Sequence, residues 1–221
     1  MLTRTDEQIK RDVVTELRWD HRVDAGDISV TVTDGVVTLT GSVPSYTARN
    51  FATSDAWGIA GVKDVNNMLT VSFPATVTVP SDAQIESSID STLTWNPDVN
   101  SVNIDVSVVN GTVTLEGTVD NYWQKWKAED LVSDLSGVIT VENHLTVVPT
   151  EDFVDQDIAE DIEAALERNL YVESESVTVK VEDGEATLTG TLLSDYARQR
   201  AYSAAANTLG VVNVNNNIVV A

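Results

Sequence analysis

Cysteine is absent from this chain of 221 residues. Its absence excludes a disulfide framework, thiolate chemistry and zinc sites of the cysteine type. Long apolar runs are absent too, since no segment approaches the ~18 consecutive apolar residues that span a bilayer. The N-terminal segment before Val13 is charged and lacks the apolar stretch of a signal peptide. As written, the chain is therefore expected to be soluble and cytoplasmic, or periplasmic if an upstream signal has been removed.

Basic side chains are few. The chain has 13 lysines and arginines against 35 aspartates and glutamates, a formal net charge of −22. This charge repels polyanions, so we expect no nucleic-acid partner. The excess of acid grows along the chain, from −3 over residues 1–74 to −9 over 75–149 and −10 over 150–221. Acidity of this kind is typical of a solubilising surface or of a saline solvent rather than of a site.

Residue patterns that carry catalysis are also missing. The two histidines, His21 and His144, form no ligand cluster in the sequence. There is no nucleophile elbow, no dinucleotide-binding glycine motif and no P-loop. The densest acidic run, 151–163, lacks the ligand spacing of a calcium loop and suits the first turns of a helix. We expect no catalytic residue, no metal site and no cofactor.

What the chain does contain is one pattern written three times. Adding 76 to a residue number maps the first copy onto the second, and adding 73 more maps the second onto the third. The recurring landmarks are Ile9, Ile85 and Ile158; Gly35, Gly111 and Gly184; Gly41, Gly117 and Gly190; Gly61, Gly137 and Gly210; and Asn67, Asn143 and Asn216. A repeat of this length indicates tandem modules, which we place at residues 1–73, 80–148 and 153–221.

Each module is expected to begin with a helix and a hairpin. Apolar residues at every fourth position, such as Ile9 and Val13, predict one buried helix stripe. The expected helix caps are Thr5, Ser81 and Asp155, the first two in capping boxes with Gln8 and Gln84. Alternating apolar residues then predict a strand, and Asp34-Gly35 and its equivalents favour a type I′ turn. Tryptophans at the end of the first helix, Trp19 and Trp95, are expected to pack under the following loop.

The rest of each module is expected to be a return strand, a second helix and a last strand. The return strand is predicted to end at a glycine where a side chain would obstruct a bend or a close helix, at Gly41, Gly117 and Gly190. The asparagines at 67, 143 and 216 are expected to satisfy backbone groups near a strand irregularity. The predicted module is αββαβ, an α+β fold with two helices on one face of a small mixed three-stranded sheet.

This order resembles the BON domain family, named for bacterial osmotically inducible and nodulation proteins. The resemblance is carried by the hairpin glycine, the (V/A)-T-L-(T/E)-G strand, the Gly-Val pair and the closing Val-x-Asn-x-(L/I), and it covers about 6–71, 82–147 and 155–220. It implies a non-enzymatic role linked to osmotic stress and the cell envelope, with phospholipid binding proposed for the domain. Many relatives are exported, whereas no signal is visible here. The family glycine corresponds to Gly41, Gly117 and Gly190.

Aromatic and basic residues gather at the start of the second helix. In the second module, Lys125 and Lys127 are the only basic residues, and they alternate with Trp123 and Trp126. Rings and cations together suit a lipid headgroup layer, or an acidic or aromatic protein partner. Packing of this helix face on a neighbouring module is the alternative. The candidate contact residues are Trp123, Lys125, Trp126 and Lys127, with Arg49, Arg198 and Arg200 as weaker equivalents.

These observations predict a non-catalytic binding protein of osmotic or envelope stress. We expect it to contact a membrane phospholipid surface or an envelope component by avidity, because linked weak contacts bind together more tightly than one. The alternative is a protein–protein scaffold or a holdase-like stress protein, acting through the same residues or through an exposed sheet edge.

Overall fold

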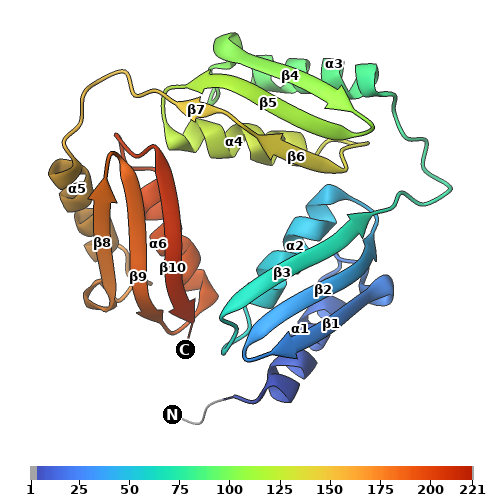
Figure 1. Cartoon of the computed structure of the whole chain (residues 1–221), viewed down its shortest axis with the longest axis horizontal. Coiled ribbons are helices and arrows are strands. Elements are labelled where there is room, and N and C mark those ends of the chain that lie inside the picture. Colours follow the sequence, from blue (N-terminus) through green and yellow to red (C-terminus); the bar gives the residue numbers. More distant parts are fainter. Residues whose placement is uncertain (1–3, 221) are drawn as a thin grey trace. The chain divides into compact units, whose positions relative to one another are not determined.

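The computed structural model describes residues 4–220. Its elements follow one order three times: a helix, a short 3₁₀ turn, two strands, a second helix and a last strand (Figure 1). The first module comprises α1 (Asp6–Trp19), η1 (Ala25–Asp27), β1 (Ile28–Thr33), β2 (Val36–Val43), α2 (Tyr46–Trp57) and β3 (Asp64–Val71). The second comprises α3 (Asp82–Trp95), η2 (Ser101–Asn103), β4 (Ile104–Val109), β5 (Thr112–Val119), α4 (Tyr122–Ser133), β6 (Thr140–Asn143) and β7 (Thr146–Val147). The third comprises α5 (Asp155–Glu167), η3 (Ser174–Ser176), β8 (Val177–Glu182), β9 (Glu185–Leu192), α6 (Asp195–Ala206) and β10 (Asn213–Val220).

Each module contains one small mixed sheet with its return strand in the centre. In the first module β2 pairs antiparallel with β1 and parallel with β3. The second module repeats this pairing, with β6 and β7 following one another along β5. In the third, β9 lies between β8 and β10. Both helices cover one face of each sheet (Figure 1). The predicted α+β architecture of three αββαβ modules is confirmed.

The hairpin turn has the predicted type I′ geometry. Asp34 and Gly35 both have positive φ, 54° and 82°, as this turn requires at its two central residues. Asn110 with Gly111 and Asp183 with Gly184 repeat these values closely. The dipeptides therefore determine the strand pairing from local sequence alone.

A side chain at the strand glycine would be obstructed, as predicted, but the glycine does not end its strand. Gly41 does not end its strand, because β2 continues to Val43. A Cβ on Gly41, whose φ is +120°, would lie 1.9 Å from the carbonyl oxygen of Asp27 in η1. The same contact, at 2.0 Å, recurs at Gly117 and Gly190. Glycine is needed because the backbone at the junction of η1 and β1, where Ile28 pairs with Gly41, comes too close for a side chain.

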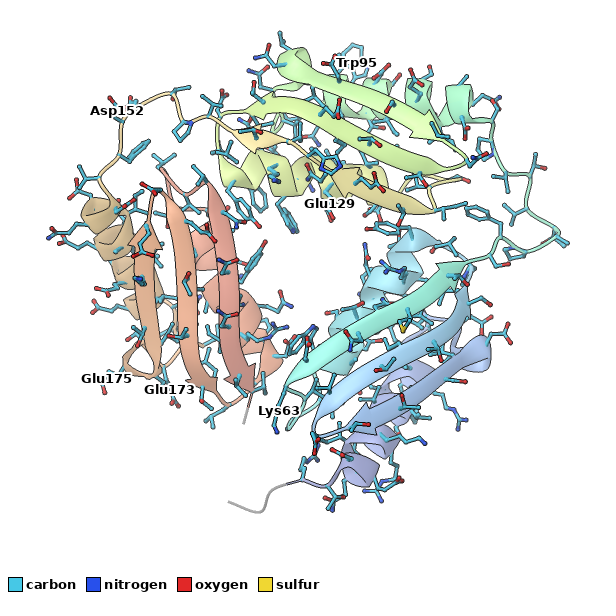
Figure 2. All side chains as sticks on the ribbon, in the orientation of Figure 1. Lys63, Trp95, Glu129, Asp152, Glu173 and Glu175 are labelled. Atoms are coloured by element: carbon cyan, nitrogen blue, oxygen red, sulfur yellow. The ribbon has the colours of Figure 1, made fainter. Side chains whose placement is uncertain are left out.

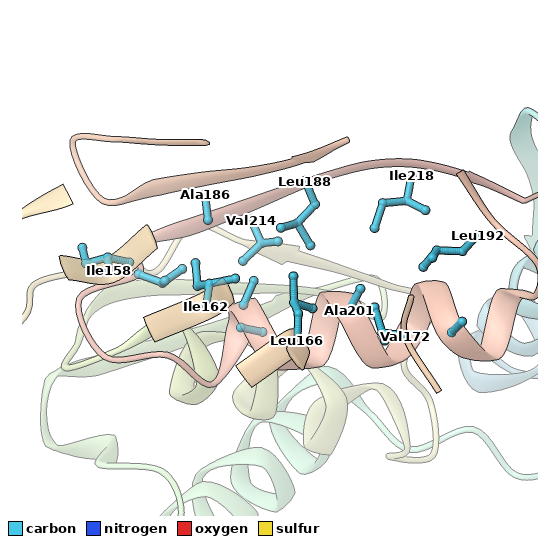
Figure 3. Packing of buried hydrophobic residues seen from close by; sticks show 14 residues of the cluster. Ile158, Ile162, Leu166, Val172, Ala186, Leu188, Leu192, Ala201, Val214 and Ile218 are labelled. Atoms are coloured by element: carbon cyan, nitrogen blue, oxygen red, sulfur yellow. The ribbon is translucent and has the colours of Figure 1, made fainter. Parts of the chain in front are cut away.

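The core of each module lies between its helices and its sheet. In the third module the helix stripe of Ile158, Ile162 and Leu166 packs against Leu188 of the central strand (Figure 3). Fully buried alanines of α6, such as Ala201, bring that helix close to the sheet. Burying each large aliphatic side chain contributes about 1.5–3 kcal/mol, so the stripe predicted from periodicity supplies much of the stability of the module.

One predicted helix cap is wrong. Thr5 does form a capping box with Gln8, but the cap of α5 is Val154, and Asp155 is the first helical residue. The carboxylate of Asp155 instead accepts hydrogen bonds from the backbone N–H groups of Asp183 and Gly184, both at 2.8 Å. Asp6 and Asp82 make the same pair of bonds to their own hairpin turns. Each module therefore has a carboxylate that ties the start of its first helix to its hairpin.

Candidate functional site

The candidate surface begins at the first turn of α4. Asn121 caps this helix by accepting a hydrogen bond from Gln124 N at 2.9 Å. Trp123 and Trp126 lie on one helix face, as their spacing predicted, and their rings stack with centroids 4.8 Å apart and planes 27° apart. Trp126 is 37% exposed, whereas Trp123 is half-buried. Part of the Trp126 indole is therefore open to solvent, and stacking on Trp123 supports it.

Lysines flank this tryptophan pair. The Lys127 ammonium is 2.8 Å from Asp130 Oδ2 and 5.9 Å from the Trp126 ring centroid. Lys125 is half-buried and forms no ion pair within residues 4–220. Because the Lys127 ammonium lies beside the Trp126 ring in a helix that also carries Glu129 (labelled in Figure 2) and Asp130, this surface is amphipathic rather than simply cationic. We call Trp123, Lys125, Trp126 and Lys127 the α4 surface.

Tyr122, immediately before the α4 surface, has a packing role. Pro80–Leu192 and Tyr196–Ile218 belong to one compact unit, and inside it the Tyr122 and Tyr202 hydroxyl groups lie 3.0 Å apart. Tyr122 also packs against the core of the third module. Burial is the main cause that raises the pKa of Tyr202. Inter-module packing therefore involves the tyrosine of this helix start.

The three arginines that were weaker candidate contact residues have different surroundings. The Arg49 guanidinium donates to the carbonyl oxygens of Leu69 and Asn67, both at 3.1 Å, so it is engaged inside its own module. Arg198 is buried, at 8% exposure. Of these three arginines, Arg200 is the one whose side chain is exposed to solvent.

The tryptophans at the end of the first helices are exposed, contrary to the prediction that they pack under a loop. Trp19 is 75% exposed. Trp95, labelled in Figure 2, is 86% exposed. Both are the last residue of their helix, and the chain that follows turns away to the 3₁₀ segment without covering them. An indole in this position is available to a partner or to a lipid interface.

The recurring asparagine has the structural role that the sequence predicted. Asn67 Oδ1 accepts from Leu69 N at 2.9 Å, and its amide donates to Arg49 O at 2.8 Å. Asn143 and Asn216 repeat both bonds. The side chain therefore connects the last strand to the second helix in every module.

A charged cluster that the sequence did not predict occurs in the first module. The Arg22 guanidinium contacts the Asp20 carboxylate at 2.6–3.0 Å and lies 3.9 Å over the Phe51 ring. The hydrogen bond from Arg22 is the main cause that lowers the pKa of Asp20 to about 2. Burial, followed by the charge of Asp20, raises the pKa of Asp55 to about 6. Asp55 Oδ2 is buried without a hydrogen-bond partner among the described residues.

The two histidines lie in different modules. His144 is exposed, with Nε2 3.9 Å from Glu142 Oε2, and His21 is exposed elsewhere. Among residues 4–220, no three histidine or carboxylate side chains are arranged to hold a metal ion. Over the same residues, none of the helices has the length and apolar character to cross a bilayer.

The curated proteins that are similar to this chain include two from bacteria. Osmotically-inducible protein Y of Escherichia coli is 34% identical over 130 residues, which make up 57% of this chain and 65% of that protein. The outer membrane lipoprotein DolP of Haemophilus influenzae is 30% identical over 135 residues, 60% of this chain and 69% of that protein. The chain thus spans about two thirds of the length of these relatives.

A solved structure and a domain family also match. The C-terminal domain of CdsD, the structural protein of the Type III secretion system of Chlamydia trachomatis, is 16% identical over 96% of both chains, with a TM-score of 0.27, too low to support a conclusion. The BON domain matches residues 5–72, 81–149 and 154–221. These three regions coincide with the three αββαβ units of the structure. The chain therefore belongs to the BON domain family and carries three tandem copies of the domain.

Proposed function

We propose that this chain is a non-catalytic binding protein of osmotic or envelope stress that contacts phospholipid headgroups through the α4 surface. Its membership of the BON family and its similarity to an osmotically inducible protein and to an outer membrane lipoprotein support the stress and envelope role. The similarity to an outer membrane lipoprotein also favours an envelope location. Triplication supports a binding role, because repeated modules add contacts whereas catalysis needs one unique constellation.

The observation that carries the lipid proposal is the stacked Trp123–Trp126 pair, with Lys127 beside the Trp126 ring and Lys125 in the same helix. Indole rings favour the headgroup layer, where the ring is partly dehydrated, and ammonium groups reach phosphate oxygens at the same depth. The net charge of −22 repels anionic lipid at long range, but at physiological salt this repulsion is screened beyond about 8 Å. Local contact then depends on the rings and their neighbouring cations.

Vesicle co-sedimentation tests this proposal. The full chain is mixed with vesicles of phosphatidylglycerol and phosphatidylethanolamine, and separately with phosphatidylcholine vesicles. We expect the wild-type chain to partition and Trp123→Ala/Trp126→Ala to lose most of that partitioning. The double variant Lys125→Gln/Lys127→Gln is expected to lose binding to the anionic vesicles more than to the neutral ones. Thermal melts confirm that each variant is folded.

Two variants serve as controls. Lys10→Gln removes a basic side chain from the first module and should leave partitioning unchanged. Trp95→Ala removes an exposed indole outside the α4 surface. If partitioning depends on Trp95 and not on the α4 pair, the assigned contact is wrong. Absence of any partitioning, together with pull-down of protein partners without lipid, would support the protein scaffold in place of membrane contact.

A further inference from the structure

The third module contains a groove whose charge is opposite to that of the rest of the module. It lies between the second half of α5 and the second half of α6 with the residues that follow α6, and it has a volume of about 440 Å³. Its lining residues include two arginines, several polar side chains and one carboxylate: Arg168, Asn169, Arg200, Ser203, Asn207 and Asp161. Residues 150–221 carry 14 acidic and 4 basic side chains. Half of those basic side chains therefore line a single groove.

The two arginines are available to a ligand. Arg168 and Arg200 are both exposed, and neither is ion-paired in the part of the chain that the structure describes. By contrast, Lys180 is paired with Glu182 at 2.7 Å, and Arg198 is buried. Arg168 also suits the C-terminal end of α5, where a cation is favoured by the helix dipole. Arg200 lies within α6 and has no such role.

The same place in the first module has the opposite chemistry. The repeat spacing makes Trp19, Asp20, Phe51 and Asp55 the equivalents of Arg168, Asn169, Arg200 and Ala204. In the first module Arg22 covers Phe51 and is neutralised by Asp20. In the third, both carboxylates are replaced by uncharged residues and both aromatic rings by arginines. The first module therefore has a cluster in which Arg22 is neutralised by Asp20. At the equivalent place the third module has an open groove with two guanidinium groups that form no ion pair in the described part of the chain.

We propose that this groove is a binding site for a phosphate group. Guanidinium groups form forked, charge-assisted hydrogen bonds with phosphate oxygens, and two of them match the charge of a phosphate monoester dianion. The volume accommodates the phosphate and a small organic group. Ala204 leaves the space that the carboxyl group of Asp55 occupies in the first module, and exposed Leu209 adds an apolar wall. The site belongs to the third module and does not depend on the α4 surface.

The test is a titration of the full ¹⁵N-labelled chain followed by NMR. Glycerol 3-phosphate and inorganic phosphate are the soluble probes, sodium chloride at equal ionic strength is the reference, and phosphatidylglycerol vesicles supply phosphate from a lipid headgroup. We expect saturable shifts at the amides of residues 168, 200, 203 and 207 with a phosphate source and none with chloride. Arg168→Gln and Arg200→Gln should each weaken binding by about tenfold or more, since each removes a charge-assisted hydrogen bond.

Matched variants make the result decisive. Lys180→Gln removes the same charge from a strand outside the groove and should leave affinity within about twofold, because the exposed pair it breaks is worth little. Asp161→Asn removes the carboxylate that lines the groove and should tighten binding. If the arginine variants lose binding of the soluble phosphate probes, the ligand is a soluble phosphate compound. If they lose binding of the vesicles only, the ligand is a lipid headgroup. Either result supports the site.

Three results would overturn the inference. The first is shifts that chloride reproduces, and the second is binding unchanged in the double variant Arg168→Gln/Arg200→Gln. The third is vesicle binding that depends on the α4 tryptophans and not on the two arginines. The third result would still support lipid contact through the α4 surface. Failure of the phosphate groove can therefore be distinguished from failure of the proposed function.

Discussion

At the scale of single residues, repeat-equivalent positions in this chain fall into two groups. Asn67 and its equivalents keep one identity because each makes the same bonds between the last strand and the second helix. The position of Asp55 changes to Leu131 and Ala204, because no bond common to the modules depends on it. Positions that keep one residue in all three modules therefore have a role in the fold. Positions whose residue changes between modules are where the modules differ in their chemistry.

The Asp55 carboxyl predicts a pH dependence of stability. Burial and the charge of Asp20 raise the pKa of Asp55 to about 6, against 3.8 for an ordinary aspartate, and Glu16 adds to the rise while Arg22 opposes it. Between these values the folded chain binds more protons than the unfolded chain, so stability falls as pH rises. The contribution is fully present below about pH 4 and is lost as pH passes about 6. Asp20, whose pKa is lowered to about 2, stays ionised throughout this window.

Urea denaturation at a series of pH values measures this effect. The free energy of unfolding should decrease between pH 4 and pH 7 by more in the wild type than in Asp55→Asn, which cannot titrate. A carboxyl resonance of Asp55 that titrates near 4 would contradict the assignment. Equal pH dependence of the two chains would contradict it as well.

At the scale of elements, each hairpin is held by a carboxylate 28 residues earlier in the chain. Asp6, Asp82 and Asp155 occupy the first helical position of their modules, and each accepts from two consecutive turn N–H groups. These N–H groups have no partner within the two-residue turn, and a carboxylate accepts both at once. The helix dipole stabilises the same charge. The first helix and the hairpin are thereby linked through space.

Removing one such carboxylate should destabilise its module. Asp82→Ala is expected to lower the free energy of unfolding by about 1.5–3 kcal/mol, because hydrogen bonds to a charged group are lost. Asp82→Asn keeps one acceptor oxygen and should lose less. Asp90→Ala, at an exposed position of the same helix, is the control and should change stability by no more than about 0.5 kcal/mol. Urea denaturation is the measurement, and equal effects at the two positions would contradict the role of Asp82.

At the scale of the whole molecule, charge is the dominant feature. The formal net charge is −22, and the second and third modules carry most of it. Few carboxylates are paired: within the described residues the ion pairs that involve lysine or arginine engage Asp12, Asp20, Asp130 and Glu182. The remaining acids repel one another in the folded chain more than in the expanded unfolded chain. Folding therefore carries an electrostatic cost, and added salt reduces that cost.

Salt should accordingly stabilise this protein. Raising sodium chloride from about 0.01 M to about 1 M shortens the Debye length from about 30 Å to about 3 Å, and we expect the melting temperature at neutral pH to rise by several degrees. Differential scanning calorimetry measures the change. Near pH 4.1, the isoelectric point calculated from the sequence, the same addition should have little effect. A melting temperature that falls with salt at neutral pH would show that specific ion pairs outweigh the general repulsion.

Much of the fold could be predicted because its signals are local. The helix stripe of Ile9 and Val13 follows from a period of four residues, and Asp34-Gly35 specifies its turn from two residues. The shared helix face of Trp123 and Trp126 also follows from their spacing of three residues, whereas the stacking of their rings is seen only in the structure. The contact role of that pair stays a prediction. The wrong assignments are Gly41 as the end of its strand, Asp155 as a helix cap, and Trp19 as packed under a loop. The contacts that decide Asp155 and Trp19 are with residues outside the local pattern: the hairpin that Asp155 binds and the loop that leaves Trp19 exposed.

The sequence by itself determined three modules of one fold, the order of their elements and the identity of their cores, because hydrophobic periodicity and turn dipeptides act over a few residues. Only the tertiary structure decided which side chains meet across the module. It placed the carboxyl groups of Asp20 and Asp55 next to each other, and it brought Arg168 and Arg200 to one groove. Such pairs are separated by tens of residues, and their approach depends on how helices pack on the sheet, which no local pattern encodes.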